Sequence, residues 1–118
     1  MAVFVDGKNR FSIALRDFTR SIRLSTADET FNTSVVTTGG SFDVDPNTGI
    51  LGLTSALNFT VSDIQASTTF TKIILQGETV IVGSTEITPL FIEIPLDDPV
   101  TFTVDGIFTL NSISVDYN

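Results

Sequence analysis

The sequence predicts an all-β protein: an antiparallel β-sandwich or jelly-roll-like body preceded by a short N-terminal arm or helix. Three observations point to this fold class. The 118 residues suffice for one domain with its own core. The apolar residues are mainly Val, Ile, Leu and Phe, and the many Thr and Ser residues beside them also suit strands. About eight short alternating runs, separated by closely spaced turn residues, are typical of antiparallel sandwiches.

The chain is expected to form a single domain, residues 1–118, because no internal repeat, low-complexity tract or linker interrupts it. Residues 1–20 form a basic arm or short helix, and residues 21–118 form the β body. A helix is predicted from Lys8 to Phe18, where Phe11, Leu15 and Phe18 fall on one helical face. The first part of this run also fits the period of a strand.

The first half of the body alternates between strands and turns. We expect a strand at Ser21–Thr26, another from Phe31 onward, and a loop at residues 37–40. Short strands at 41–44 and 50–53 flank the turn Asp45–Gly49, in which Pro46 fixes φ and the glycine accepts a positive value. Residues 57–61 alternate apolar and polar side chains, which predicts a half-buried strand.

Two hairpins are predicted in the second half. Gln76-Gly77 separates apolar runs at 69–75 and 78–82, and Asp105-Gly106 is a strong signal for a type I′ turn. Between them, residues 90–94 form a strand and Pro95–Pro99 a stiff loop. The apolar phase of the last strand, 107–117, slips near Asn111, which predicts a β-bulge.

Charge is distributed unevenly along the chain, whose net charge is −8. After Leu24 the only basic residue is Lys72, against twelve acids. Such an asymmetry indicates two surfaces with different partners. The basic arm either docks on a larger assembly or packs against the acidic body of its own or a sister subunit. The strongly negative net charge argues against nucleic acid as a partner. The candidate docking residues are Lys8, Arg10, Arg16, Arg20 and Arg23.

Catalytic chemistry finds little support. The chain has no His and no Cys, so the usual general base and the thiolate nucleophile are missing. Lys72 has no serine three residues before it, because Thr69 stands there. Asp97 and Asp98 are read as a solvated pair in a loop. We therefore expect no enzymatic activity and no catalytic, cofactor or metal site.

The stretch FDVDPNTGIL at residues 42–51 places oxygen donors at alternating positions, as a calcium loop does. An EF-hand loop starting at Asp43 needs Gly at its sixth position and Glu at its twelfth, which here are Thr48 and Thr54. The stretch is also similar to a strand-turn-strand segment of cadherin repeats, whose other calcium motifs are absent. We read it as turn chemistry.

No apolar run approaches the length of a membrane span, so no membrane partner is expected. The first ten residues, MAVFVDGKNR, lack a signal-peptide core, and we expect no Sec export.

Several segments in order resemble small bacteriophage proteins of the tail and tail-fibre type. They are a short N-terminal helix, SIRLSTADE, VVTTGGSF, TFTKIILQGETVIVGSTEITP and DDPVTFTVDGIFTLNSISVDY. The resemblance implies a non-enzymatic virion structural protein that decorates or cements the capsid or is attached to the tail. It implies other virion proteins as partners, a homo-oligomer, and assembly in the bacterial host cytoplasm. The chain departs from the usual pattern in its short helix and in a hairpin reduced to Gln76-Gly77.

The alternative is a receptor- or carbohydrate-binding β-sandwich module. Sugar sites usually present exposed aromatic side chains, whereas this chain has no Trp and a single Tyr. A carboxylate hydrolase is the least supported of the three functions.

Overall fold

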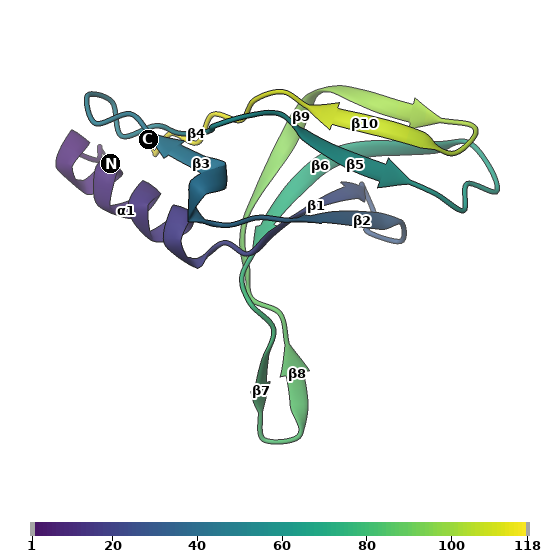
Figure 1. Ribbon diagram of the computed structural model, residues 1–118, viewed down its shortest axis with the longest axis horizontal. Coiled ribbons are helices and arrows are strands. Elements are labelled where there is room, and N and C mark those ends of the chain that lie inside the picture. The colour runs from purple at the N-terminus through teal and green to yellow at the C-terminus, as the bar shows by residue number, and fades with distance from the viewer. Residues whose placement is uncertain (1, 118) are drawn as a thin grey trace.

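The computed structural model describes residues 2–117, which form antiparallel β-structure with one α-helix at the N-terminal end (Figure 1). The all-β class is thereby confirmed. The helix α1 spans Val5–Phe18, beginning three residues earlier than predicted. The remaining elements are β1 (Ser21–Thr26), β2 (Asn32–Val36), the 3-10 turn η1 (Gly39–Ser41), β3 (Phe42–Val44), β4 (Leu51–Leu53), β5 (Leu57–Val61), β6 (Thr68–Gln76), β7 (Val80–Val82), β8 (Thr85–Ile87), β9 (Leu90–Phe102) and β10 (Gly106–Leu110).

The largest sheet has four strands in the order β2-β1-β6-β9, all antiparallel to their neighbours. Three further pairs, β5–β10, β3–β4 and β7–β8, stand outside it. The pair β5–β10 shares one hydrophobic core with the sheet: Phe59 of β5 belongs to the same cluster as Leu24 of β1 and Phe70 of β6. All three side chains are fully buried, as expected where strands face one another across a core.

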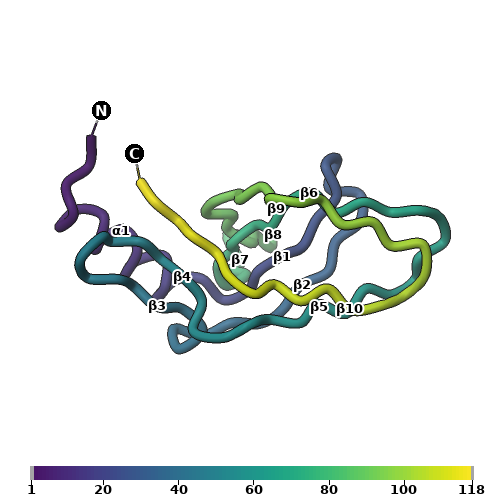
Figure 2. The backbone as a smooth tube through the Cα atoms, turned by 90° about the horizontal axis from the view of Figure 1, so that it is seen from above, coloured from purple at the N-terminus to yellow at the C-terminus, as the bar shows by residue number. Residues whose placement is uncertain are grey.

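The turn between β3 and β4 is confirmed. Gly49 adopts a φ of +74°, and its N–H donates to the carbonyl oxygen of Asp45 at 2.7 Å. The carboxylate of Asp45 accepts the N–H of Asn47 at 2.9 Å, which is a local turn contact. Figure 2 shows this turn and the C-terminal segment beside α1 at the same end of the molecule.

The predicted hairpin at Gln76-Gly77 is wrong. Gln76 is the last residue of β6 and pairs with Leu90 of β9, and Gly77 donates its N–H to the carbonyl oxygen of Pro89 at 2.8 Å. The chain then continues into β7 and turns only at Gly83, whose φ is +67°. A glycine at the first central position of a two-residue turn suits type II′. The Gly-Ser pair between VIV and TEI is the signal that sequence reasoning missed.

The predicted hairpin at Asp105-Gly106 is also wrong. The strand before it, β9, pairs with β6, whereas β10 pairs with β5, so the chain crosses from the sheet to the second pair. The carboxylate of Asp105 accepts the N–H of Ile64 at 2.9 Å and is thus used for a loop contact. A Cβ at Gly106 would lie 2.9 Å from Cε2 of Phe102, so close packing accounts for the glycine.

Two irregular segments also differ from expectation. Pro95–Pro99 lies within β9: Pro95 pairs with Lys72 and Val100 with Phe70, so residues 96–99 bulge out opposite residue 71. The predicted bulge near Asn111 is instead the end of β10, after which a single bridge joins Val115 to Leu51. Both Leu110 and Val115 are buried, so the apolar phase changes because the strand stops.

Candidate docking surface

The helix α1 is attached to the body mainly through polar residues. Ser12 is fully buried, and its hydroxyl donates to the carbonyl oxygen of Gly49. The side-chain amide of Asn9 donates to the carbonyl oxygen of Pro46 at 3.1 Å. The contact is close, because a Cβ built on Gly49 would lie 2.3 Å from Cβ of Lys8. The hydrogen bonds that attach α1 to the body are therefore made by polar side chains, and Leu15 adds an apolar contact with the core cluster.

The large apolar residues of α1 and its flank are left largely in solvent. Phe4 is 88%, Phe11 52% and Phe18 65% exposed. Phe11 makes one edge-to-face contact with Tyr117, with ring centroids 5.5 Å apart. The predicted helical face of Phe11, Leu15 and Phe18 is divided in the structure: Leu15 is partly buried against the core cluster, whereas Phe11 and Phe18 stay largely exposed. An amphipathic helix normally buries such a face.

The second unusual feature is the β7–β8 hairpin, which projects from the sheet (Figure 1). Every residue of both strands is exposed, including Ile81 at 71%. Its base is closed by the hydroxyls of Thr79 and Thr88, 2.6 Å apart. An isolated two-stranded hairpin is marginally stable in water. The hairpin is thus an apolar element that the rest of the chain leaves largely exposed.

The helix and the hairpin are joined by two adjacent hollows, the first apolar and the second lined by Arg20 and Glu78 as well as by apolar residues. A groove of about 390 Å³ lies between α1 and the start of β9, lined by Ala14, Leu15, Phe18, Leu90 and Phe91. A second hollow, of about 220 Å³, shares two of these phenylalanines and reaches Val80 on the hairpin. We call these residues and the exposed hairpin side chains the α1–hairpin surface. Large exposed apolar patches mark interaction sites.

The basic residues predicted to dock lie in three different settings. Lys8 forms an ion pair with Asp116 at 2.9 Å, so this part of the arm packs on its own body. Arg16 pairs with its neighbour Asp17 at 3.0 Å, and Arg20 donates to the backbone carbonyl oxygens of residues 17 and 19. Arg10 is exposed on the helix. Of the five, Arg20 is the one that lines the hollow containing Phe18 and Phe91.

Arg23 lies apart from the arm, inside β1. It donates to Oε1 of Gln76 at 2.8 Å and lies 3.9 Å from a carboxylate oxygen of Glu29. Gln76 in turn donates to the hydroxyl of Ser21 at 2.8 Å. This network satisfies polar groups of the central strands, so its evident role is within the sheet.

The charged residues weighed for chemistry are either paired with carboxylates, as Lys72 is, or exposed, as Asp97 and Asp98 are. Lys72 lies 2.7 Å from Glu93 and 3.4 Å from Glu29. The hydrogen bond to Glu93 raises the pKa of Lys72 above its ordinary value, the opposite of what a nucleophilic lysine needs. Asp97 and Asp98 are exposed in the bulge of β9. Among residues 2–117, no group of three or more His, Cys, Asp or Glu side chains is placed to hold a metal ion.

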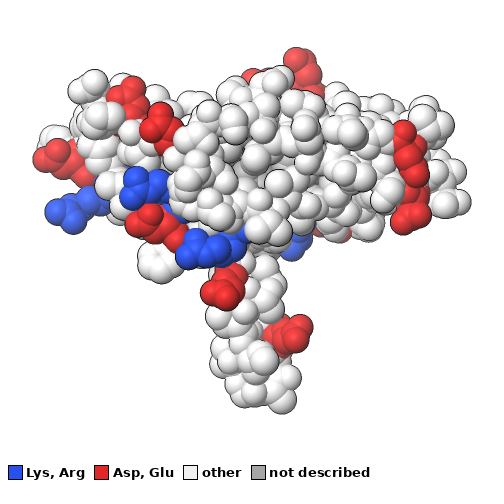
Figure 3. All heavy atoms as spheres, viewed as in Figure 1, with Lys and Arg blue, Asp and Glu red and all other residues white. Residues whose placement is uncertain are grey.

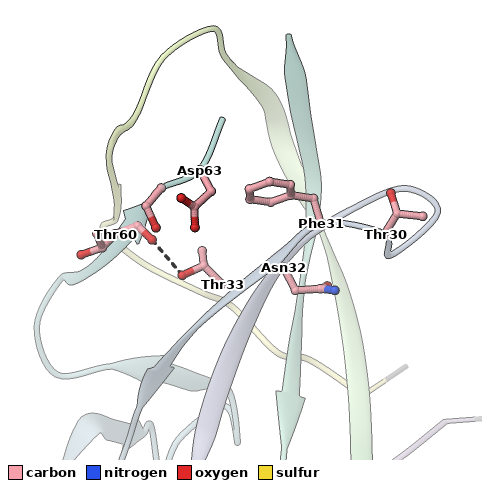
Figure 4. A pocket seen from close by; sticks show the side chains of 7 residues that line it. Thr30, Phe31, Asn32, Thr33, Thr60 and Asp63 are labelled. Carbon is pink, nitrogen blue, oxygen red and sulfur yellow. Dashed lines mark hydrogen bonds between the residues drawn. The ribbon is translucent and has the colours of Figure 1, made fainter. Parts of the chain in front are cut away.

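A polar hollow of about 290 Å³ lies near the end of β2, beside β5 (Figure 4). The hydroxyl of Thr33 donates to the carbonyl oxygen of Thr60 at 2.9 Å and bridges the two strands there. Asp63 has a φ of +62°, rare for a residue with a side chain. The hollow is lined by Thr30, Phe31, Asn32, Thr33, Thr60, Ser62 and Asp63.

Sequence reasoning found the basic residues and missed the hairpin. The available signal was the run VIVGSTEI, in which a Gly-Ser turn separates two short β-rich segments. No helix within residues 2–117 has the length and apolar character that crossing a membrane requires. Comparison of the chain with protein-family models, with curated proteins and with solved structures gives no match.

Proposed function

We propose that this protein is a non-enzymatic structural subunit, an accessory protein of a bacteriophage particle that decorates the capsid or is attached to the tail. The observation that carries the proposal is the polar attachment of α1, which leaves Phe4, Phe11 and Phe18 outside the core. A chain that keeps its aromatic helix residues in solvent needs a partner to cover them. The kind of assembly that we propose, a bacteriophage particle, is taken from the resemblance of the sequence to small bacteriophage proteins.

The surface has the composition expected of a protein–protein interface. Aromatic and aliphatic residues lie at its centre, and Arg10, Arg16 and Arg20 lie on or beside the same helix. Interfaces commonly combine an apolar centre with a polar rim, and arginine is enriched in them. Against the acidic surface of a partner, these arginines would steer the encounter and fix orientation. The basic arm is therefore proposed to dock together with the apolar groove.

The side-chain chemistry supports a role without catalysis. The chain lacks His and Cys, and its one lysine in the sheet is held by two carboxylates. We also propose that the body is a small sandwich. In support, β5 and β10 contribute Phe59, Val61 and Leu110 to the cluster that contains Ile22 and Phe70 of the four-stranded sheet.

The test is the location and copy number of the chain in particles of the phage whose genome encodes it. Quantitative mass spectrometry and cryo-EM of purified particles should find it on the shell or on the tail. Phe18→Ser should reduce its copy number, because this ring lies at the centre of the proposed interface. Val104→Ser is the matched control, since Val104 is equally exposed, at 70%, and lies outside the α1–hairpin surface. Absence of the wild-type chain from the particle would contradict the proposal.

A second function is favoured by the polar hollow near β2. The hydroxyl of Thr33 and the carboxylate of Asp63 lie there beside the ring of Phe31, a combination suited to a hydroxyl-rich ligand such as a glycan (Figure 4). Binding on a glycan array that is lost on Asp63→Asn and retained on Phe18→Ser would favour this receptor-binding role over docking. A lack of binding to every glycan on the array would contradict the receptor-binding role.

A further inference from the structure

We propose that the α1–hairpin surface binds a second copy of this chain, with the β7–β8 hairpin of each copy lying in the groove between α1 and β9 of the other. The inference deepens the proposed function and rests on it for the premise that this surface is covered in an assembly. It adds the identity of the first partner, which is the chain itself.

The pairing register gives the hairpin one strongly apolar face. Val80 pairs with Ile87 and Val82 with Thr85, so these four side chains share one face, while Ile81 and Glu86 lie on the other. The first face is continuous with the hollow that Val80 shares with Phe18 and Phe91. The hairpin is therefore a narrow apolar projection whose apolar side begins at the groove.

Projection and groove on one continuous surface meet the requirement of a two-fold interface. In such an interface the same patch serves both partners, so each region must fit a region elsewhere in the same patch. Here the hairpin is the convex part, and the groove lined by Leu15, Phe18 and Leu90 is the concave part. Two copies facing each other would cover the hairpin and the groove of each copy at the same time.

The β7–β8 hairpin and the helix α1 carry net charges of opposite sign. Residues 78–88 contain Glu78 and Glu86 and no basic residue. Residues 5–20 contain four basic residues and only Asp6 and Asp17 as acids. Figure 3 shows the hairpin with only acidic charges and basic groups gathered toward α1 and the junction. A hairpin laid along α1 of another copy would therefore be attracted by Arg20, which lines the hollow next to the groove.

Light scattering coupled to size-exclusion chromatography is the first test, run over a concentration series on the full chain. The wild-type protein should be dimeric and dissociate on dilution. Phe18→Ser and Ile87→Ser should each weaken the dimer roughly tenfold to a hundredfold, as expected for removing a large buried apolar side chain from an interface. Val104→Ser should leave the dissociation constant unchanged. A wild-type protein that stays monomeric throughout the series overturns the inference.

Cysteine crosslinking tests the geometry, since the chain has no cysteine of its own. Ala14→Cys in the groove and Val82→Cys on the hairpin are made in separate proteins and mixed under mild oxidation. A mixed disulfide dimer should form, because the two positions meet only between copies. Ala14→Cys mixed with Thr101→Cys, exposed near the far end of β9, should give none. Equal crosslinking in both mixtures overturns the proposed arrangement.

The outcomes separate this inference from the proposed function. A monomer in solution whose particle incorporation still depends on Phe18 would mean that another virion protein fills the groove, so the inference fails and the function stands. If the chain forms the dimer with the expected crosslink but is absent from particles, the inference stands and the proposed function fails.

Discussion

Two neighbouring strands, β6 and β7, have similar apolar residues and opposite surroundings. In β6 the side chains of Phe70, Ile73 and Leu75 are buried, whereas every residue of β7 is exposed. Only residues 77–79 separate them. The difference shows that β-forming residues determine where a strand forms, while burial depends on which other segments come to cover it.

The reason lies in the number of neighbours. β6 is flanked by β1 and β9, and its inner face packs against Phe59 of β5. β7 has a single short neighbour, β8, and no second layer covers it within residues 2–117. The sheet thus supplies the stability of the monomer, and the hairpin is the region that we propose to be covered by a partner. Four predictions test this division.

The largest effect is expected from truncation in the sheet. Phe70 is fully buried and makes edge-to-face contacts with Phe31 and Phe102. Phe70→Ala should lower the free energy of unfolding by about 3–5 kcal/mol. Ile81→Ala in the hairpin should change it by less than about 0.5 kcal/mol. Urea unfolding at a concentration where the protein is monomeric measures both, and equal losses would contradict the division.

Two glycines with positive φ form a closer comparison. Gly49, at +74°, faces Lys8 and Asn9 of α1, while Gly83, at +67°, has open space where a Cβ would stand. Gly49→Ala should cost about 1–3 kcal/mol from backbone strain plus a further loss from displacing α1. Gly83→Ala should cost about 1 kcal/mol, confined to the hairpin.

Thermal unfolding should detect the first substitution, and hydrogen exchange of the hairpin amides should detect the second. Exchange in β1 and β6 should be unaffected by Gly83→Ala, because the hairpin opens locally. A global loss of protection from that substitution would mean that the hairpin and the sheet unfold as one unit.

A substitution at Gly77, at the junction between the sheet and the hairpin, should change the free energy of unfolding only slightly. A Cβ at Gly77 would lie 2.8 Å from Cζ of Phe91. The ring is partly exposed and can swing outward, so Gly77→Ala should cost only about 1 kcal/mol. Its clearer consequence is a displaced Phe91, visible as altered aromatic NMR signals. Unchanged ring signals would show that the backbone moves instead.

The smallest effect concerns pH. Hydrogen bonds from the hydroxyl and N–H of Thr30, and from the hydroxyl of Thr26, lower the pKa of Asp28 below its ordinary value of 3.8. This carboxylate therefore stabilises the β1–β2 turn at neutral pH, and the contribution is lost as the pH falls through the lowered pKa. NMR signals of residues 26–31 should shift on acidification below pH 3.8, and in Asp28→Asn this transition should disappear.

The β7–β8 turn provides the internal control for that titration. Its central residues, Gly83 and Ser84, are not ionisable, so its amide signals should stay constant over the same interval. A parallel shift of both turns would indicate general unfolding in acid.

Local sequence alone determined the all-β class, α1, the strand positions up to residue 61 and the turn at Asp45–Gly49, because these depend on side-chain periodicity and on the φ of single residues. The basic residues could also be identified from it, since charge is visible without a fold, and their role in docking stays a prediction.

Only the tertiary structure decided which strands pair and which apolar residues stay outside the hydrophobic core. Asp105-Gly106 favours a tight hairpin turn, but no such hairpin forms there, because β10 pairs with β5, which is distant in the sequence. The exposure of Phe18 follows from the docking of α1 through Ser12 and Asn9. Periodicity places residues on a common face, but it does not say which face of a helix or hairpin the rest of the chain will cover.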